Sequence, residues 1–118
     1  MKISDDRTIR SIQEEFNSKF PYLKLEFYNK PHEIGEGSQK QSLIDADKTI
    51  GEVRTIHAEG DLSINGHLKV GTLEQNFTDI YGLNVQIFRD SNGLWLQTTS
   101  TDDWTLADQN RRGEEFRN

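Results

Sequence analysis

Apolar side chains recur at helical spacing in two stretches of the chain. Each stretch has apolar residues at positions i, i+3, i+7 and i+11, which lie on one face of an α-helix. The first set is Ile9, Ile12, Phe16 and Phe20, and the second is Val70, Leu73, Phe77 and Tyr81. A helix breaker follows directly in both cases, Pro21 in the first and Gly82 in the second. The pattern predicts two amphipathic helices over about residues 6–20 and 70–81.

A strand with alternating apolar residues follows each predicted helix. The apolar positions are Leu23, Leu25 and Phe27 in the first strand and Leu83, Val85 and Ile87 in the second. Such alternation is typical of a strand with one buried face. We therefore predict strands over 23–28 and 83–88, each ending on an aromatic residue that departs from the alternation, Tyr28 or Phe88.

The second half also contains a hairpin signal. Asn92 and Gly93 form a dipeptide that readily adopts the positive φ angles of a tight turn, and an apolar segment follows it. We therefore predict a strand over 94–98 that pairs with the strand before the turn. At the corresponding place the first half has a segment rich in glycine and glutamate, residues 31–40, which indicates a long loop. Further strands are predicted over 54–58 and 62–65, and a weaker one over 41–44.

The two halves of the chain follow the same order of elements at nearly constant sequence offsets. Each apolar position of the first helix lies the same number of residues before its counterpart in the second helix, beginning with Ile9 and Val70. The corresponding positions of the two strands are separated by one residue fewer. A third, slightly shorter offset relates the pair Thr49 and Glu52 to the pair Thr105 and Asp108, each at the spacing of a capping box. This spacing predicts two short helical turns. The alternative to duplication is a chance match between two amphipathic helix–strand segments.

Together these patterns predict an α+β fold. We expect two amphipathic helices packed on a mainly antiparallel sheet, with a pseudo-two-fold axis relating two similar halves, about 1–55 and 56–118. Predicted strands rather than a proline- or serine-rich linker join the halves, so we expect a single compact domain over 1–118. Two separate units of about 55 residues, each with so few apolar residues, would be only marginally stable alone.

The second half resembles the ubiquitin-like β-grasp in its order of elements. A strand leads into the helix at 70–81, a strand and a hairpin follow, and the turn over 105–110 is similar to the Thr-Leu-Ser-Asp-Tyr-Asn turn of ubiquitin. Residues 60–110 more closely resemble small bacterial domains of unknown function, chiefly from Bacteroides-type genomes, and residues 3–54 resemble them more faintly. The shared motifs are Val70-Gly71-Thr72-Leu73, Tyr81-Gly82-Leu83 and Asp102-Asp103-Trp104-Thr105-Leu106-Ala107. The resemblance implies a duplicated β-grasp-like scaffold and implies no activity.

Composition and charge narrow the classes of function. The chain has 14 Lys and Arg against 20 Asp and Glu, a net charge of -6, and no cysteine. The lack of a basic stripe argues against nucleic acid, and the lack of cysteine excludes disulfides and thiol catalysis. No apolar run approaches the roughly 18 residues of a membrane span, and no apolar signal segment opens the chain. We therefore expect a cytoplasmic protein that makes no contact with a membrane.

The sequence contains no constellation typical of catalysis, metal binding or cofactor binding. His32 follows Pro31 in the glycine-rich loop, which disfavours the helix that a zinc motif there would need. Acidic pairs each precede a predicted helical start, where negative charge stabilises the helix dipole. These pairs are Asp5-Asp6, Asp45/Asp47 and Asp102-Asp103. We therefore predict no catalytic residue, no metal and no cofactor.

Aromatic side chains provide the candidate binding site. If the strand over 94–98 is regular, Trp95 faces away from Leu94 and Leu96, which we expect on the core side. Tyr28 and Phe88 also leave the apolar faces of their strands. Either the other half of the chain covers these aromatics, or Trp95, Phe88 and Tyr28 form an exposed patch that contacts a protein.

The preferred hypothesis is a non-catalytic β-grasp-like module that binds another protein or a second copy of itself. Two alternatives remain open. A pocket between the halves could bind a small molecule or catalyse a reaction, using His57, His67 and nearby acids. The acidic chain could instead act as an inhibitor or antitoxin-like partner of a basic protein, which would give a salt-sensitive complex.

Overall fold

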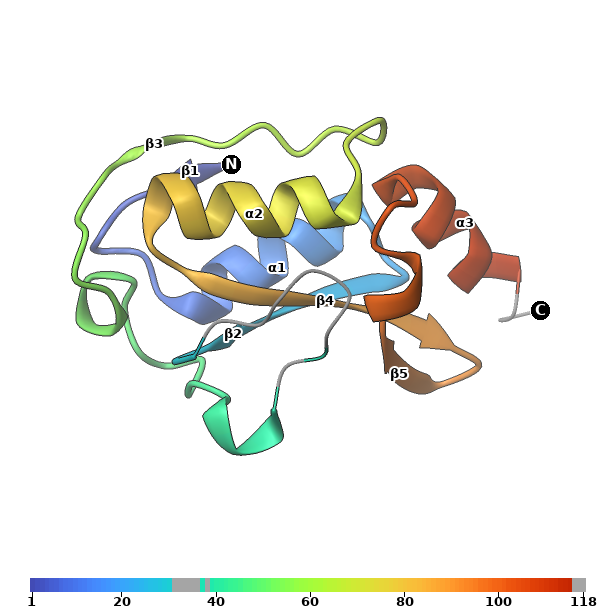
Figure 1. The fold of residues 1–118 in the computed structure, drawn as a ribbon, viewed down its shortest axis with the longest axis horizontal. Helices are drawn as coiled ribbons and strands as arrows, with labels where there is room; N and C mark the ends of the chain where they lie inside the picture. The colour runs from blue at the N-terminus through green and yellow to red at the C-terminus, as the bar shows by residue number, and fades with distance from the viewer. Residues whose placement is uncertain (31–36, 38, 116–118) are drawn as a thin grey trace.

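The computed structural model describes residues 1–30, 37 and 39–115. Within these ranges, three α-helices pack on antiparallel strands (Figure 1), so the α+β class is confirmed. The helices are α1 Ile9–Lys19, α2 Val70–Tyr81 and α3 Leu106–Glu115. The strands are β1 Lys2–Ile3, β2 Leu23–Tyr28, β3 Gly60–Asp61, β4 Asn84–Ser91 and β5 Leu94–Gln97. None of the helices in the described ranges has the length and apolarity needed to cross a membrane.

The main sheet places β4 between β2 and β5, and both neighbours are antiparallel to it. β1 and β3 form a separate two-stranded pair. α1 contacts β2 and α2 contacts β4 on one face of the main sheet (Figure 1). The rings of Phe27 and Phe77 meet there edge to face, with centroids 5.9 Å apart. Apolar side chains from both halves therefore share one core cluster.

The two helices with apolar periodicity form where the sequence predicts them. Thr8 caps α1, because its hydroxyl oxygen accepts a hydrogen bond from the N–H of Ser11 at 3.1 Å. α1 begins slightly later than predicted, because residues 5–8 form the turn that carries this cap. Gly82 ends α2 in the left-handed conformation, with φ 64°, as glycine often does after a helix.

The first backbone N–H groups of α1, and likewise those of α2, donate hydrogen bonds to carbonyls of a turn beside that helix. Such groups have no acceptor inside their own helix. At the start of α1, the N–H groups of Ile9 and Arg10 donate to the carbonyls of Lys48 and Ala46. At the start of α2, the N–H groups of Val70 and Gly71 donate to the carbonyls of Trp104 and Asp102. All four hydrogen bonds are 2.7 to 2.9 Å long. The donor residues in α1 and α2 are separated by the same number of residues as the apolar positions of the two helices. The acceptor residues are separated by the same number as the two predicted capping boxes. These correspondences fit a duplication, whereas the β-grasp-like character of the repeat stays a prediction.

Three predicted strands are wrong. The segments 54–58 and 62–65 form no strand, and 41–44 overlaps the 3-10 turn η1, Lys40–Ser42. Leu62 and Ile64 are buried and Ser63 is exposed, so the alternation is real. It marks an extended segment lying on the core, and a strand also needs a neighbour to pair with. In the described ranges β1 pairs with Gly60–Asp61, and Leu62 exchanges two hydrogen bonds with Met1 at 2.8 and 2.9 Å, so the pairing covers only the beginning of this region.

The turn predicted at Thr105 is the beginning of a longer helix, α3, and the predicted total of two helices is corrected to three in the described ranges. Leu106 is fully buried, but the next inward positions are Gln109 and Gly113. A polar and a small residue leave no apolar period to recognise in the sequence. Gly113 allows close packing, since a Cβ there would lie 2.7 Å from Cβ of Tyr22.

Candidate functional site

The candidate site is the hairpin formed by β4 and β5. Asn92 and Gly93 have φ angles of 54° and 91°, so two residues in the left-handed region reverse the chain, as predicted from the Asn-Gly step. The carboxylate of Asp90 accepts a hydrogen bond from the N–H of Gly93 at 2.7 Å and holds the turn. The hairpin extends beyond the ends of α1 and α2, and β5 lies at the edge of the sheet (Figure 1).

The leucines of β5 are exposed, and their predicted place in the core is wrong. The register pairs Leu96 with Arg89, which puts Leu96 on the helix-bearing face of the sheet, as the alternation predicts. Leu94 is nevertheless 65% exposed and Leu96 40% exposed. The reason is that α1 and α2 end before they reach β5 (Figure 1). Two apolar side chains are thus presented to solvent on an edge strand.

Trp95 and Phe88 lie together on the opposite face, and both are partly exposed. The ammonium of Lys24 lies 5.2 Å from the ring centroid of Phe88 and 5.1 Å from that of Trp95. These distances permit cation–π attraction to both rings. Trp95 and Lys24 also line a hollow of about 300 Å³ beside α1, together with Arg10 and Glu26. The structure therefore brings two of the three predicted aromatics into one surface.

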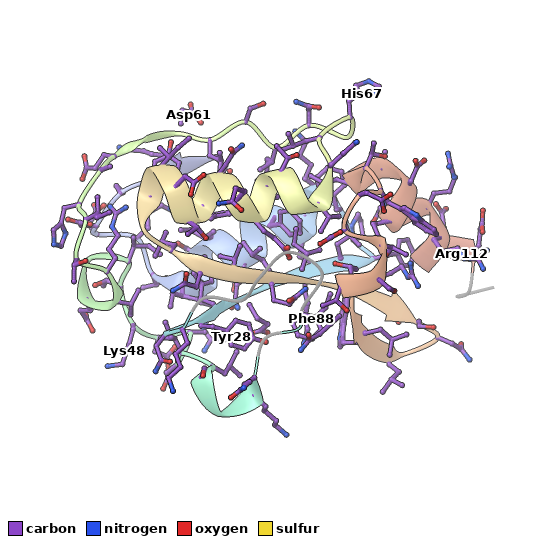
Figure 2. All side chains as sticks on the ribbon, in the orientation of Figure 1. Tyr28, Lys48, Asp61, His67, Phe88 and Arg112 are labelled. Atoms are coloured by element: carbon purple, nitrogen blue, oxygen red, sulfur yellow. The ribbon has the colours of Figure 1, made fainter. Side chains whose placement is uncertain are left out.

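Tyr28 does not join this surface, because it is only 4% exposed. It lies on the same face of the sheet as Phe88 but further along the ladder (Figure 2). Leu43 forms a bridge with Tyr28. Burial and the negative charge of Glu26 raise the pKa of the Tyr28 phenol to about 12. Tyr28 is therefore covered rather than exposed, but the bridging residue, Leu43, belongs to its own half and not to the other half as predicted.

The two histidines that a pocket between the halves would use, His57 and His67, lie apart in the structure. His57 Nδ1 lies 2.7 Å from Oδ2 of Asp5, near the end of α2, where Arg54 joins Asp5 to the carbonyl of Tyr81. His67 precedes the start of α2, at the other end of that helix (Figure 2). The hydrogen bond from Arg54 lowers the pKa of Asp5 most, and the bond to His57 lowers it further. Within the described ranges, no three His, Cys, Asp or Glu residues are close enough together to hold a metal ion.

The acidic pairs lie in turns before helical segments, and several of their carboxylates have local partners. Asp47 pairs with Arg10 at 2.9 Å, and Asp6 accepts a hydrogen bond from the Ser4 hydroxyl at 2.6 Å. The hydroxyl oxygen of Thr105 accepts the N–H of Asp108 at 3.1 Å, which is one of the two bonds of the predicted capping box, whereas the Asp108 carboxylate accepts a hydrogen bond from Arg111 at 2.6 Å. His32 lies outside the described residues, as does most of the predicted loop 31–40.

Two further hollows occupy matching positions in the two halves. One, of about 470 Å³, is lined by Lys48 and Glu52 among others, and one, of about 340 Å³, by Trp104 and Asp108 among others. Lys48 corresponds to Trp104, and Glu52 to Asp108, at the offset of the two capping boxes. The guanidinium of Arg89 lies 5.8 Å from the ring centroid of Trp104. Sequence reasoning missed both hollows. The first is lined by separate segments between Asn29 and Thr55, and the second mostly by α3, a helix longer than the turn predicted there.

Comparisons with protein-family models, with curated proteins and with solved structures gave no match for this chain. The resemblance to small Bacteroides-type domains therefore stays a prediction. Inference about function depends on the geometry of the hairpin.

Proposed function

We propose that this chain is a cytoplasmic, non-catalytic protein-interaction module with a duplicated, β-grasp-like scaffold, related to the Bacteroides-type domains that it resembles. Its contact surface is the β5 edge, defined by Leu94, Trp95 and Leu96, with Phe88 beside it. The observation that carries the proposal is the exposure of both leucines on an edge strand. Apolar edge strands are templates for pairing with another chain, so soluble proteins usually cover or charge them.

The opposite edge of the same sheet supports the choice of β5. Its outward carbonyls, in β2, are occupied by groups from the same chain. Leu23 accepts from the Asn17 amide at 2.8 Å, Leu25 from the Gln13 amide at 2.8 Å, and Phe27 from the N–H of Ile44 at 2.9 Å. Side chains of α1 therefore close much of the β2 edge, which leaves β5 as the more open edge of this sheet among the residues that the structure describes.

The proposal of a duplicated scaffold has its own support. Arg54 donates to the carbonyl of Tyr81, in the helix–strand turn of the second half, at 2.9 Å. Asn110 corresponds to Arg54 at the offset of the capping boxes. Its side-chain oxygen accepts the N–H of Tyr22, in the helix–strand turn of the first half, at 2.8 Å. Each half thus holds the turn of the other. A crystal structure in which residues 5–30 and 66–90 do not superpose as helix–strand units would contradict the duplication.

Affinity capture from the source cell tests the interaction function. The bait chains are the wild type, a Leu94→Ser/Leu96→Ser variant, and an Ile56→Ser/Ile80→Ser control whose replaced side chains are comparably exposed, at 53% and 50%. We expect the wild type and the control to retain the same protein, which the β5 variant loses while its melting temperature stays close to that of the wild type. Equal retention by all three baits, or retention by none together with a monomeric chain, would refute the proposal. Capture that high salt abolishes would favour a basic partner instead.

A further inference from the structure

We infer that the partner at the β5 edge is a second copy of this chain, and that two copies join by antiparallel β5–β5 pairing centred on Trp95. The inference rests on the proposed interaction surface and names its occupant. The joined sheet would run from β2 through β4 and β5 of one copy to β5, β4 and β2 of the other.

The backbone of Trp95 is oriented for such pairing. In an antiparallel ladder, successive residues direct their N–H and C=O groups alternately to the two sides. The N–H of Thr98 donates to Ile87 at 3.2 Å, so Ile87 bonds toward β5, and the N–H of Asp90 donates to Tyr22 at 2.9 Å, toward β2. Trp95 is paired opposite Asp90 and therefore directs its own N–H and C=O outward.

A two-fold axis at Trp95 gives a self-complementary register. Symmetry requires Trp95 to lie opposite Trp95 of the second copy, and Leu94 to lie opposite Leu96 of the second copy. The outward groups of the two Trp95 residues would exchange two hydrogen bonds. The four leucines would gather on the helix-bearing face and the two indoles on the other. The side chains exposed at 65% and 40% would then be covered by copies of each other.

Charge also favours a second copy. Residues 91–101 contain no Lys, Arg, Asp or Glu, although the whole chain has a net charge of -6. Pairing at β5 therefore places no like charges of the two copies opposite each other on the paired strands. A basic partner segment would find no carboxylate on this strand. The edge also lacks the lysine or proline that commonly keeps an edge strand unpaired.

Sedimentation velocity over a wide range of concentration tests the dimer. The wild type is expected to sediment with twice the mass of one chain, whereas Leu94→Lys and Leu96→Lys sediment as monomers. Ile56→Lys and Ile80→Lys add the same charge at comparably exposed positions and are expected to remain dimers. Amide hydrogen exchange adds a direct measurement. Exchange at Trp95 should slow as the concentration rises, whereas Leu94 and Leu96, whose amides point toward β4, should not change.

A wild type that is monomeric at every concentration overturns the inference, as does a Leu94→Lys chain that still dimerises. If the wild type is monomeric but captures another protein through Leu94 and Leu96, the interaction function stands and the second copy is the wrong partner. If a dimer forms and tolerates both lysine substitutions, the dimer uses a different surface and the inference is overturned. A concentration-dependent dimer that both lysines abolish, with slowed exchange at Trp95, supports the pairing.

Discussion

Replacing Arg54 with Met removes a guanidinium from the junction between the two halves and keeps the apolar stem of the side chain. The Arg54 side chain is fully buried. Its Nε and Nη2 donate to Oδ1 of Asp5 at 3.0 and 2.7 Å, and its Nη1 donates to the carbonyl of Tyr81 at 2.9 Å. The substitution therefore separates the turn before α1 from the end of α2.

The expected magnitude follows from what each former partner does afterwards. The carbonyl of Tyr81 remains in a buried place without its donor, and an unsatisfied buried polar group costs about 1–3 kcal/mol. The carboxylate of Asp5 is 36% exposed and can be hydrated, so its loss adds little. We expect Arg54→Met to lower the free energy of unfolding by about 1–3 kcal/mol, out of about 5–15 kcal/mol for a domain of this kind.

The same cluster predicts a pH dependence. Arg54 lowers the pKa of Asp5 in the folded state below its ordinary value of 3.8, and His57 lowers it further. A carboxyl group with a lowered pKa contributes stability above its unfolded pKa and loses that contribution as the pH falls through the folded pKa. Arg54→Met removes the largest cause of the shift. The stability difference between wild type and variant should therefore narrow on acidification below the unfolded pKa.

Urea unfolding of both chains at neutral pH and at about pH 3 measures both effects. Arg10→Met is the matched control, since Arg10 pairs with Asp47 at 2.9 Å but is 55% exposed. The control should change stability by less than about 0.5 kcal/mol. An Arg54→Met chain that loses no more than the control, or a difference that widens in acid, would refute the reasoning.

Three further predictions concern the core, the third helix and a buried phenol. Phe77→Ala should cost about 3–5 kcal/mol by thermal unfolding, because Phe77 is fully buried, whereas Ile80→Ala on the exposed side of α2 should cost far less; equal losses would mean that the helix face is misassigned. Gly113→Ala should destabilise by about 1–3 kcal/mol despite the better helix propensity of alanine, because its Cβ would lie 2.7 Å from Cβ of Tyr22; a stabilised variant would contradict this packing. Ultraviolet titration should detect a phenol with a pKa of about 12 that disappears in Tyr28→Phe, and a wild type whose titration curve near pH 12 is the same as that of Tyr28→Phe would contradict the burial of Tyr28.

The sequence by itself predicted the elements that depend on local periodicity and turn chemistry. The apolar positions of α2 match its observed range, and the alternation over 23–28 matches β2. The Asn92-Gly93 step identified the hairpin, because few other dipeptides take two positive φ angles at low cost. The nearly constant offsets between the two halves anticipated which turns correspond at the starts of α1 and α2.

Tertiary structure decided everything that depends on a neighbour. Leu62 and Ile64 alternate like a strand, but in the described ranges the pairing with the first residues of the chain reaches only Leu62, which leaves the rest as an extended segment on the core. α3 gave no apolar period because, after Leu106, its inward positions are a buried amide, Gln109, and a glycine, Gly113. Its existence follows from packing against β2 and β4.

The candidate site divides in the same way. The alternation along β5 correctly put Leu96 and Trp95 on opposite faces, since side-chain direction in a strand is a local property. Exposure is not local, because it depends on how far another element extends over the strand. α1 and α2 end before β5, which leaves Leu94 and Leu96 in solvent, while Tyr28 on the other face is buried. Burial is a property of the space around a residue, and that space is filled by parts of the chain distant in sequence.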